Sequence, residues 1–194
     1  MNWDCDIPSK EIIDKNKEIL AKWPFLEHRN LYSGEGYKGE ERYYSTDWND
    51  WDGTGWEKIW KLFITKLGAI WEKLPDDDYK KKFQILDTKE KYGTLRVSLS
   101  GYTEKMMDLE WALEHESRYI CINCGKQPKD SKGHRFIWTS HGWIMPFCKE
   151  CARKDYQSHG QLWKNFYTKD FMKDCVIKSN DGIKIIPSLT NFEI

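Results

Sequence analysis

The sequence lacks several features that would assign a function directly. No apolar run in its 194 residues approaches the roughly 20 residues that a membrane-spanning helix needs. Residues 1–11 are acidic and contain no apolar stretch, so we expect no secretory signal. A P-loop, a dinucleotide-binding fingerprint, a zinc-protease motif and a nucleophile elbow are all missing. We therefore expect a cytoplasmic protein that does not bind membranes and has no catalytic function.

The chain also lacks an excess of charge of either sign, with 31 Lys and Arg against 31 Asp and Glu. This balance excludes the uniformly basic surface of a protein that coats nucleic acid. The charge is nevertheless uneven, because residues 1–117 carry a net charge of −6 and residues 118–154 one of +6. A polyanion would therefore be attracted to the region 118–154.

Large aromatic side chains are abundant in this otherwise polar chain. Its mean hydropathy is −0.80, and yet 15% of its residues are aromatic, including 11 Trp. Disordered chains lack such residues, so we expect a folded core built from large rings.

Apolar periodicity predicts three helices, over residues 10–23, 57–74 and 103–116. Alternating residues predict a β-hairpin within residues 83–99, and Asn180-Asp-Gly predicts the turn of a second hairpin. The charged residues 76–82 suggest a solvated turn, and residues 30–55 a long ordered loop. The predicted class is α+β, with helices packed on a small antiparallel sheet.

Four of the six cysteines form two Cys-x2-Cys pairs, namely Cys121 with Cys124 and Cys148 with Cys151. Each pair supplies two thiolates from one tight turn, and four thiolates satisfy the tetrahedral preference of structural zinc. We therefore predict a structural Zn²⁺ ion that leaves no open position for catalysis. Cys5 and Cys175 are interpreted as free thiols.

The residues between and after the two pairs predict how this site is built. Two short strands within residues 135–147 would form a hairpin that turns near residues 141–142, and a helix would follow from residue 148. We call each Cys-x2-Cys pair with its turn a knuckle, the first over residues 121–124 and the second over 148–151. The order of a knuckle, a hairpin and a helix that carries the last ligands resembles a treble-clef zinc finger. We predict an α+β core over residues 1–117, a zinc module over 118–158 and an extension packed on the core over 159–194, forming one compact unit.

Three motifs in this order resemble a group of small bacteriophage and prophage proteins. They are Trp-Asp-Gly-Thr-Gly-Trp (51–56), Lys-Glu-Lys-Tyr-Gly-Thr-Leu-Arg (89–96) and the two cysteine pairs around Gly142-Trp143. The resemblance covers about residues 48–155. It implies a viral accessory protein in a bacterial host cytoplasm, and such proteins often counter host defences or redirect host machinery.

The preferred hypothesis is a non-enzymatic binder that sequesters a nucleotide-derived immune signal. Phosphates attract Lys and Arg, and bases stack on flat aromatic faces. The candidate ligand-binding residues combine both chemistries on one hairpin and its nearby loops: Lys89, Lys91, Tyr92, Arg96, Trp51, Trp56 and Trp143.

Three alternatives remain open from the sequence. The basic zinc module predicts nucleic-acid binding, and the Trp and Tyr surplus suits an interface with a host protein. A His-metal nuclease is less favoured, because His134, His141 and His159 lack the companion residues of such a site. The oligomeric state is not encoded in any motif.

Overall fold

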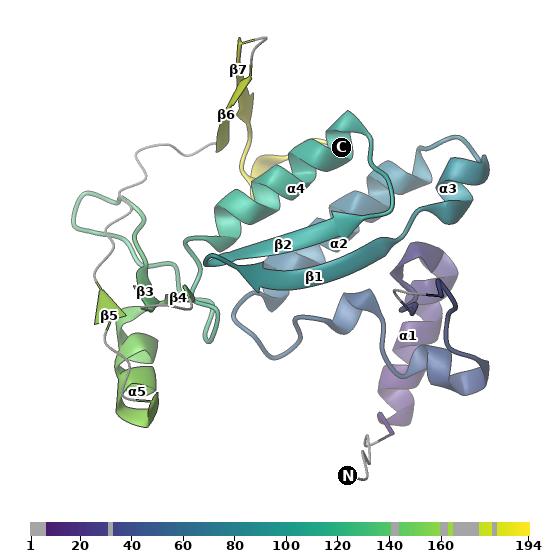
Figure 1. Cartoon of the computed structure of the whole chain (residues 1–194), viewed down its shortest axis with the longest axis horizontal. Coiled ribbons are helices and arrows are strands. Elements are labelled where there is room, and N and C mark those ends of the chain that lie inside the picture. Colours follow the sequence, from purple (N-terminus) through teal and green to yellow (C-terminus); the bar gives the residue numbers. More distant parts are fainter. Residues whose placement is uncertain (1–6, 31–32, 141–143, 160–162, 165–174, 180–181) are drawn as a thin grey trace. The chain divides into compact units, whose positions relative to one another are not determined.

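The computed structural model spans residues 1–194 and describes residues 7–30, 33–140, 144–159, 163–164, 175–179 and 182–194 (Figure 1). Its α-helices are α1 (Lys10–Lys22), α2 (Glu57–Glu72), α3 (Asp78–Lys82), α4 (Glu104–Ser117) and α5 (Lys149–His159). Its strands are β1 (Ile85–Lys91), β2 (Thr94–Leu99), β3 (Trp138–Ser140), β4 (Pro146–Phe147), β5 (Trp163–Lys164), β6 (Cys175–Ser179) and β7 (Gly182–Ile186). Short 3₁₀ turns are η1 (Pro24–Leu26), η2 (Gly39–Tyr43), η3 (Asp47–Asn49) and η4 (Leu189–Asn191). The α+β class is confirmed.

The chain divides into two units by its internal packing. The first contains residues 1–50, 75–87 and 98–101, and the second contains residues 51–74, 88–97 and 102–194. The predicted boundary between residues 117 and 118 therefore lies inside the second unit, where the cysteine module shares a unit with α2 and α4.

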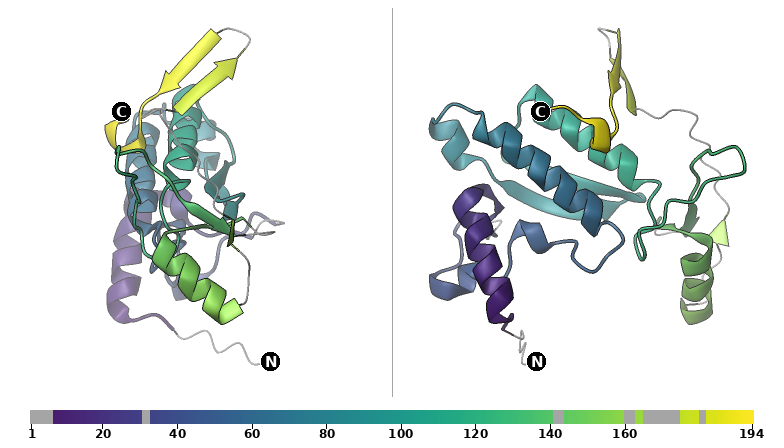
Figure 2. Two further views of the ribbon diagram at one scale, coloured as in Figure 1. Left: turned by 90° about the vertical axis from the view of Figure 1, so that its left-hand side faces the viewer. Right: turned by 180° about the vertical axis from the view of Figure 1, so that it is seen from behind.

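Helices α2 and α4 form the centre of the second unit and lie side by side (Figures 1 and 2). Residues three and four apart on α2 face this centre, as the sequence periodicity predicts. The fully buried side chains here include Trp60, Phe63 and Leu67 from α2 with Leu109 and Leu113 from α4. Thr103 caps α4 by accepting a hydrogen bond from the Met106 N–H.

The β1–β2 hairpin contributes one face to this core through Leu95 and Val97, which are buried. Ser117, the last residue of α4, accepts a hydrogen bond from the Leu95 N–H through its hydroxyl at 2.9 Å. The hairpin is thereby tied to the end of the helix that leads into the cysteine module.

The cysteine module follows the predicted order of knuckle, hairpin and helix. Strands β3 and β4 are antiparallel, with Trp138 opposite Phe147, and α5 follows directly. Strand β5 adds to the other edge of β3, which the sequence did not indicate. The predicted turn at residues 141–142 lies outside the described residues.

In the first unit, Ser9 caps α1 by accepting a hydrogen bond from the Ile12 N–H. Pro24 follows the end of the helix, as expected from its missing N–H. Phe25 and Phe83 meet edge to face with centroids 5.3 Å apart. The buried Asn16 donates to the Tyr43 carbonyl and so joins α1 to η2.

One local expectation differs from the structure. The charged stretch 76–82 contains the short helix α3, because Asp77 caps it by accepting from the Lys80 N–H.

Helix α2 begins at Glu57, and two side chains hold the turn before it. Thr54 Oγ1 accepts from the Trp56 N–H, and the Glu57 carboxylate accepts from the Gly53 N–H.

Strands β6 and β7 pair antiparallel, with Ser179 opposite Gly182, as the second predicted hairpin requires, and residues 180–181 of its predicted turn lie outside the described residues. Lys184 on β7 pairs with Glu104 and Asp108 of α4 at 2.7 and 2.8 Å. Beyond η4, the Phe192 carbonyl accepts a hydrogen bond from Lys66 of α2. Within the described residues, no helix has the length and apolar content to span a bilayer.

Candidate metal centre and hairpin surface

The structure brings the four cysteines of the two Cys-x2-Cys pairs together. Their Sγ atoms all lie within 4.8 Å of one another, and the Sγ atoms of Cys124 and Cys148 are 3.6 Å apart. A tetrahedron with metal–sulfur bonds of about 2.3 Å needs sulfur atoms about 3.8 Å apart. The cluster therefore fits a tetrahedral metal ion with four sulfur ligands.

Backbone hydrogen bonds hold this cluster. The Gly125 N–H donates to the Cys121 carbonyl at 2.8 Å, closing the first knuckle, and Gly125 has the positive φ of 72° that the turn requires. The Ile122 N–H donates to the Pro146 carbonyl at 2.9 Å, which aligns this knuckle with β4. Cys148 lies between β4 and α5, and Cys151 lies in the first turn of α5.

The environment of the thiols differs from one cysteine to the next. Burial raises the pKa of Cys121, while Cys124 is exposed. Burial also opposes ionisation of Cys124, but the Lys126 N–H and the neighbouring thiols lower its pKa overall. Lys126 also pairs with Glu150 at the start of α5, joining the two knuckles across the cluster.

The Gly-Thr-Gly part of residues 51–56 rests directly on the first knuckle, backbone against backbone. The Gly55 N–H donates to the Ile122 carbonyl at 2.5 Å. A Cβ atom added at Gly55 would collide with the Cys121 carbonyl and the Gly125 nitrogen. Residues 51–56 and the first knuckle, which are far apart in sequence, therefore touch through their backbones. This close approach accounts for the glycines at positions 55 and 125.

The neighbouring Trp56 anchors the same contact. Its side chain is fully buried, and its Nε1–H donates to the Ile120 carbonyl at 3.1 Å. A pocket of about 280 Å³ lies beside this contact and is lined by residues of the loop, the start of α2 and the knuckle, including Lys58, Asn123 and Cys124.

The tip of the β1–β2 hairpin is a two-residue turn at Tyr92 and Gly93. Both residues have positive φ, of 56° and 79°, as a type I′ turn requires. Glu90 accepts a hydrogen bond from the Gly93 N–H at 2.7 Å, and the Thr94 hydroxyl donates to the Lys91 carbonyl at 2.9 Å. The conformation of the turn is therefore imposed by its neighbours.

This turn also approaches the second knuckle. A Cβ atom at Gly93 would lie 3.3 Å from Ile144 Cγ2 and 4.0 Å from Pro146 Cδ, in the segment that leads to Cys148. Residues 51–56 and the hairpin 89–96 therefore both contact the cysteine module, at the first knuckle and at the segment before the second.

Arg96 links the hairpin to α4. Its guanidinium donates to the Thr94 hydroxyl and pairs with Glu114 at 2.7 Å, and Arg118 lies 3.9 Å from the same carboxylate. One turn earlier on α4, burial and the charge of Glu114 raise the pKa of Glu110 to about 7, while Arg96 partly opposes this rise.

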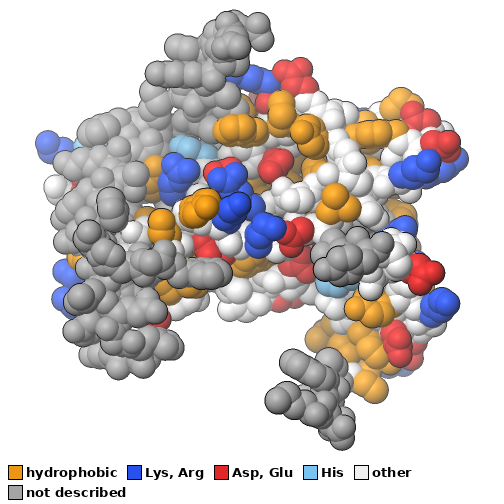
Figure 3. Space-filling view, viewed as in Figure 1, with side chains coloured by type: hydrophobic (Ala, Val, Ile, Leu, Met, Phe, Trp, Pro, Cys, Tyr) orange, Lys and Arg blue, Asp and Glu red, His pale blue; other side chains and the backbone are white. Residues whose placement is uncertain are grey.

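Of the remaining candidate ligand-binding residues, three project from the hairpin. Lys89 and Lys91 are exposed, and Tyr92 has 69% of its surface exposed. The Lys91 ammonium lies 5.4 Å from the centre of the Tyr92 ring. Lys and Arg side chains gather over the hairpin in Figure 3.

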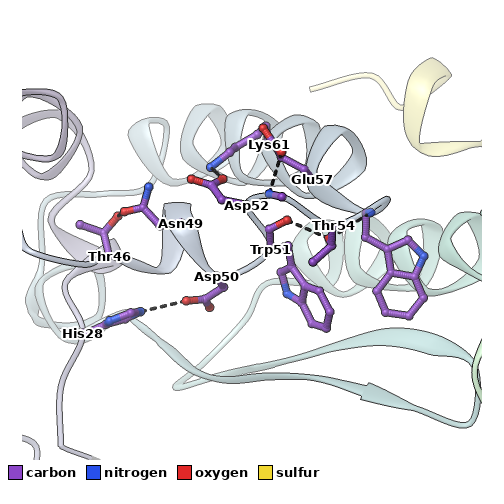
Figure 4. A network of polar contacts seen from close by, with 11 residues as sticks. His28, Thr46, Asn49, Asp50, Trp51, Asp52, Thr54, Glu57 and Lys61 are labelled. Carbon is purple, nitrogen blue, oxygen red and sulfur yellow. Dashed lines mark hydrogen bonds and ion pairs between the residues drawn. The ribbon is translucent and has the colours of Figure 1, made fainter. Parts of the chain in front are cut away.

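The tryptophan candidates are placed differently from one another. Trp56 is a core residue without an accessible ring face, so we leave it out of the ligand surface proposed below. Trp51 is half-buried and packs against Trp56 with centroids 5.1 Å apart (Figure 4). Trp143 lies outside the described residues.

The histidines of the nuclease alternative give no common site in the described part of the chain. His134 Nδ1 lies 3.0 Å from Asp130, whose pKa is lowered by the His134 N–H, so His134 belongs to a local turn. The position of His141 and the side chain of His159 are not described.

Sequence reasoning missed a second group of metal-ligating side chains, in the first unit. His28, Asp47 and Asp50 offer ligand atoms within 4.8 Å of one another. Burial lowers the pKa of His28, but hydrogen bonds and charge from both aspartates raise it to about 10. Burial raises the pKa of Asp47 to about 6, against the opposing effect of His28. Asp-x-x-Asp was visible at 47–50, but no local pattern pointed to His28.

Comparisons of the chain with protein-family models, curated proteins and solved structures gave no match. The resemblance to phage proteins therefore stays a prediction.

The contact between residues 51–56 and the first knuckle predicts an effect of Gly55→Ala. The new methyl group has no space between the two backbones, so the substitution should weaken metal binding at least tenfold in a competition titration with a chromogenic chelator. Gly53→Ala is the control for backbone strain, because Gly53 has a positive φ of 73° and open space around it, whereas Gly55 does not have a positive φ. Equal losses in both variants would contradict a specific role of the close contact at Gly55.

The raised pKa of Glu110 predicts a pH-dependent stability. The folded state holds this proton more tightly than the unfolded chain, where the pKa is about 4.3. Relative to Glu110→Gln, the wild type should lose unfolding free energy as the pH rises from about 4.5 to 7, and remain level above that. Urea titrations over this range measure the difference, and parallel curves would contradict the prediction.

Proposed function

We propose that the protein is a zinc-stabilised, non-enzymatic binding protein whose β1–β2 hairpin takes a phosphorylated, nucleotide-type ligand. The observation that carries this proposal is Tyr92. It exposes a large ring at the tip of the hairpin while holding a backbone conformation that an L-residue with a bulky side chain adopts only at a cost.

Asn-Gly would form the same turn without that cost, since Asn tolerates positive φ. A ring at this position therefore costs stability without adding to the core. Strained residues of this kind concentrate at functional sites. Glu90 and Thr94 maintain the turn, so the ring is presented on a rigid support.

The chemistry around Tyr92 suits a phosphorylated aromatic ligand. A base can stack on the exposed ring, and Lys89, Lys91 and Arg96 carry positive charge on the same hairpin. Arg96 contributes less to this attraction than the two lysines, because its guanidinium pairs with Glu114 at 2.7 Å.

In this proposal the metal is Zn²⁺, held by Cys121, Cys124, Cys148 and Cys151. Four thiolates prefer zinc among the common divalent ions and leave no position for water, so the ion acts by holding the fold. The biological setting that we propose is a phage-type accessory protein that sequesters a host immune signal in the host cytoplasm.

Nucleic-acid binding by the zinc module receives less support. One of its cations is neutralised from α4, since Arg135 pairs with Glu116, and the pair of Lys126 with Glu150 is already included in its net charge of +6. The positive charge of residues 118–154 is therefore less available than the sequence alone suggests.

Zinc can be tested by metal analysis and removal. The purified chain should contain one zinc per molecule, and chelation should unfold the second unit, because binding energy of a structural zinc is folding energy. Cys148→Ser should reproduce this effect in mass spectrometry and circular dichroism. A chain that keeps its spectrum and melting behaviour after chelation would refute a structural role.

The ligand surface can be tested with Tyr92→Asn. Asn suits the positive φ, so the unfolding free energy should stay the same or rise by about 1 kcal/mol. Loss of the stacking ring should weaken ligand binding at least tenfold in isothermal titrations against cyclic and ADP-ribose-type nucleotides.

Charge variants supply the control for this experiment. Lys91→Glu should also weaken binding at least tenfold, whereas Lys105→Glu, an exposed charge change on α4, should have little effect. No binding of any nucleotide by the wild type, or equal losses in both charge variants, would refute the hairpin as a ligand site. Salt-dependent DNA or RNA binding instead would favour the alternative.

A further inference from the structure

A group of three side chains in the first unit has the composition of a metal site. His28 Nε2 lies 3.1 Å from Asp47 Oδ1 and 3.0 Å from Asp50 Oδ1. Figure 4 shows the His28 ring directed at the Asp50 carboxylate. All three residues belong to the first unit, whereas the four clustered cysteines belong to the second.

Local backbone structure places the two carboxylates together. Asp47 opens the 3₁₀ turn η3, and Asp50 follows its last residue. Side chains three apart on a 3₁₀ turn are eclipsed, so both carboxylates project to the same side. The Thr46 hydroxyl donates to the Asn49 side-chain oxygen at 3.1 Å and braces this turn.

A second backbone contact brings the imidazole of His28 close to this turn. Glu27 and Thr46 form an antiparallel β-bridge, which brings the segment that holds His28 beside the segment that leads into η3. Main-chain pairing therefore places His28 near this turn, independently of its contacts with the aspartates.

The burial of the cluster makes its charge important. The side chains of His28, Asp47 and Asp50 are 29%, 9% and 19% exposed. Two carboxylates and a protonated imidazole leave a net charge of −1. A divalent ion with two carboxylates and a neutral imidazole is electrically neutral, which suits a partly buried site better.

The distances also suit a metal ion. An octahedron with metal–ligand bonds of about 2.1 Å has neighbouring ligand atoms about 3.0 Å apart. The imidazole nitrogen is at this distance from both carboxylate oxygens. Imidazole with carboxylates is a donor set for borderline and hard divalent ions, unlike the soft thiolates of the cysteine cluster.

We propose that His28, Asp47 and Asp50 form a second metal site, which binds one divalent first-row ion of the Mn²⁺ type through one nitrogen and two oxygen ligands. Three protein ligands leave the other positions of an octahedron to water or to the oxygen atoms of a bound molecule. The site is distinct in ligand chemistry from the four-cysteine cluster, and the two select different ions.

Mn²⁺ itself is the probe, because it avoids thiolates and gives an electron paramagnetic resonance signal when free in solution. The full-length protein, with zinc already supplied in stoichiometric amount, is titrated with Mn²⁺. We expect one Mn²⁺ to bind per chain, and echo-envelope modulation of the bound ion should show coupling to one imidazole nitrogen.

Variants locate the site. Asp50→Asn and His28→Gln keep the size of each side chain and should weaken Mn²⁺ binding at least tenfold, whereas Asp14→Asn on α1 is an acidic control that should bind as the wild type. Circular dichroism identifies any variant that does not fold. In that case the nitrogen coupling of the wild type decides whether an imidazole is a ligand of the bound Mn²⁺.

Three results would overturn the proposal. They are the absence of saturable binding up to about 1 mM Mn²⁺, unchanged affinity in both folded ligand variants, and bound Mn²⁺ without nitrogen coupling. In each case the three side chains form a structural ion-paired cluster only. Because this experiment uses neither nucleotide binding nor zinc removal, its failure leaves the proposed hairpin function standing.

Discussion

The contact between Gly55 and the first knuckle is the constraint on which the second unit depends most. Here two stretches of main chain touch with no side chain between them, and the Gly55 N–H bonds directly to the Ile122 carbonyl. The adjacent Trp56 extends the contact by bonding to the Ile120 carbonyl from within the core. Because α2 begins one residue later, this contact sets the position of the knuckle against the helical core.

The hairpin tip makes a corresponding contact at the other side of the module, where Gly93 approaches Ile144 and Pro146. Glycines from two different motifs therefore contact the module, Gly55 at the first knuckle and Gly93 at the segment before the second. Because the glycine backbone makes these contacts, the side chain of a neighbouring residue is not needed for packing and can face the solvent. Tyr92 beside Gly93 is the clearest example, since it is exposed and strained while its neighbour packs.

Elements with a local sequence pattern were predicted well. The helices α1, α2 and α4, both long hairpins and the clustering of four cysteines each follow from residues close together in the chain. Helix α3 was missed because a short charged segment has no apolar period, and only the Asp77 cap reveals it. The sequence left open whether Trp56 belongs to the core or to the ligand surface, since a tryptophan in a glycine-rich loop has the same local pattern whether it packs inward or outward.

By itself the sequence determined the α+β class and the cysteine ligand set, because each depends on residue type and short spacing. Only the tertiary structure decided which motif touches which knuckle, which tryptophan is buried, and that His28 meets Asp47 and Asp50. Those facts depend on residues about 20 to 70 positions apart, whose meeting is set by the packing of the whole unit and has no local signal.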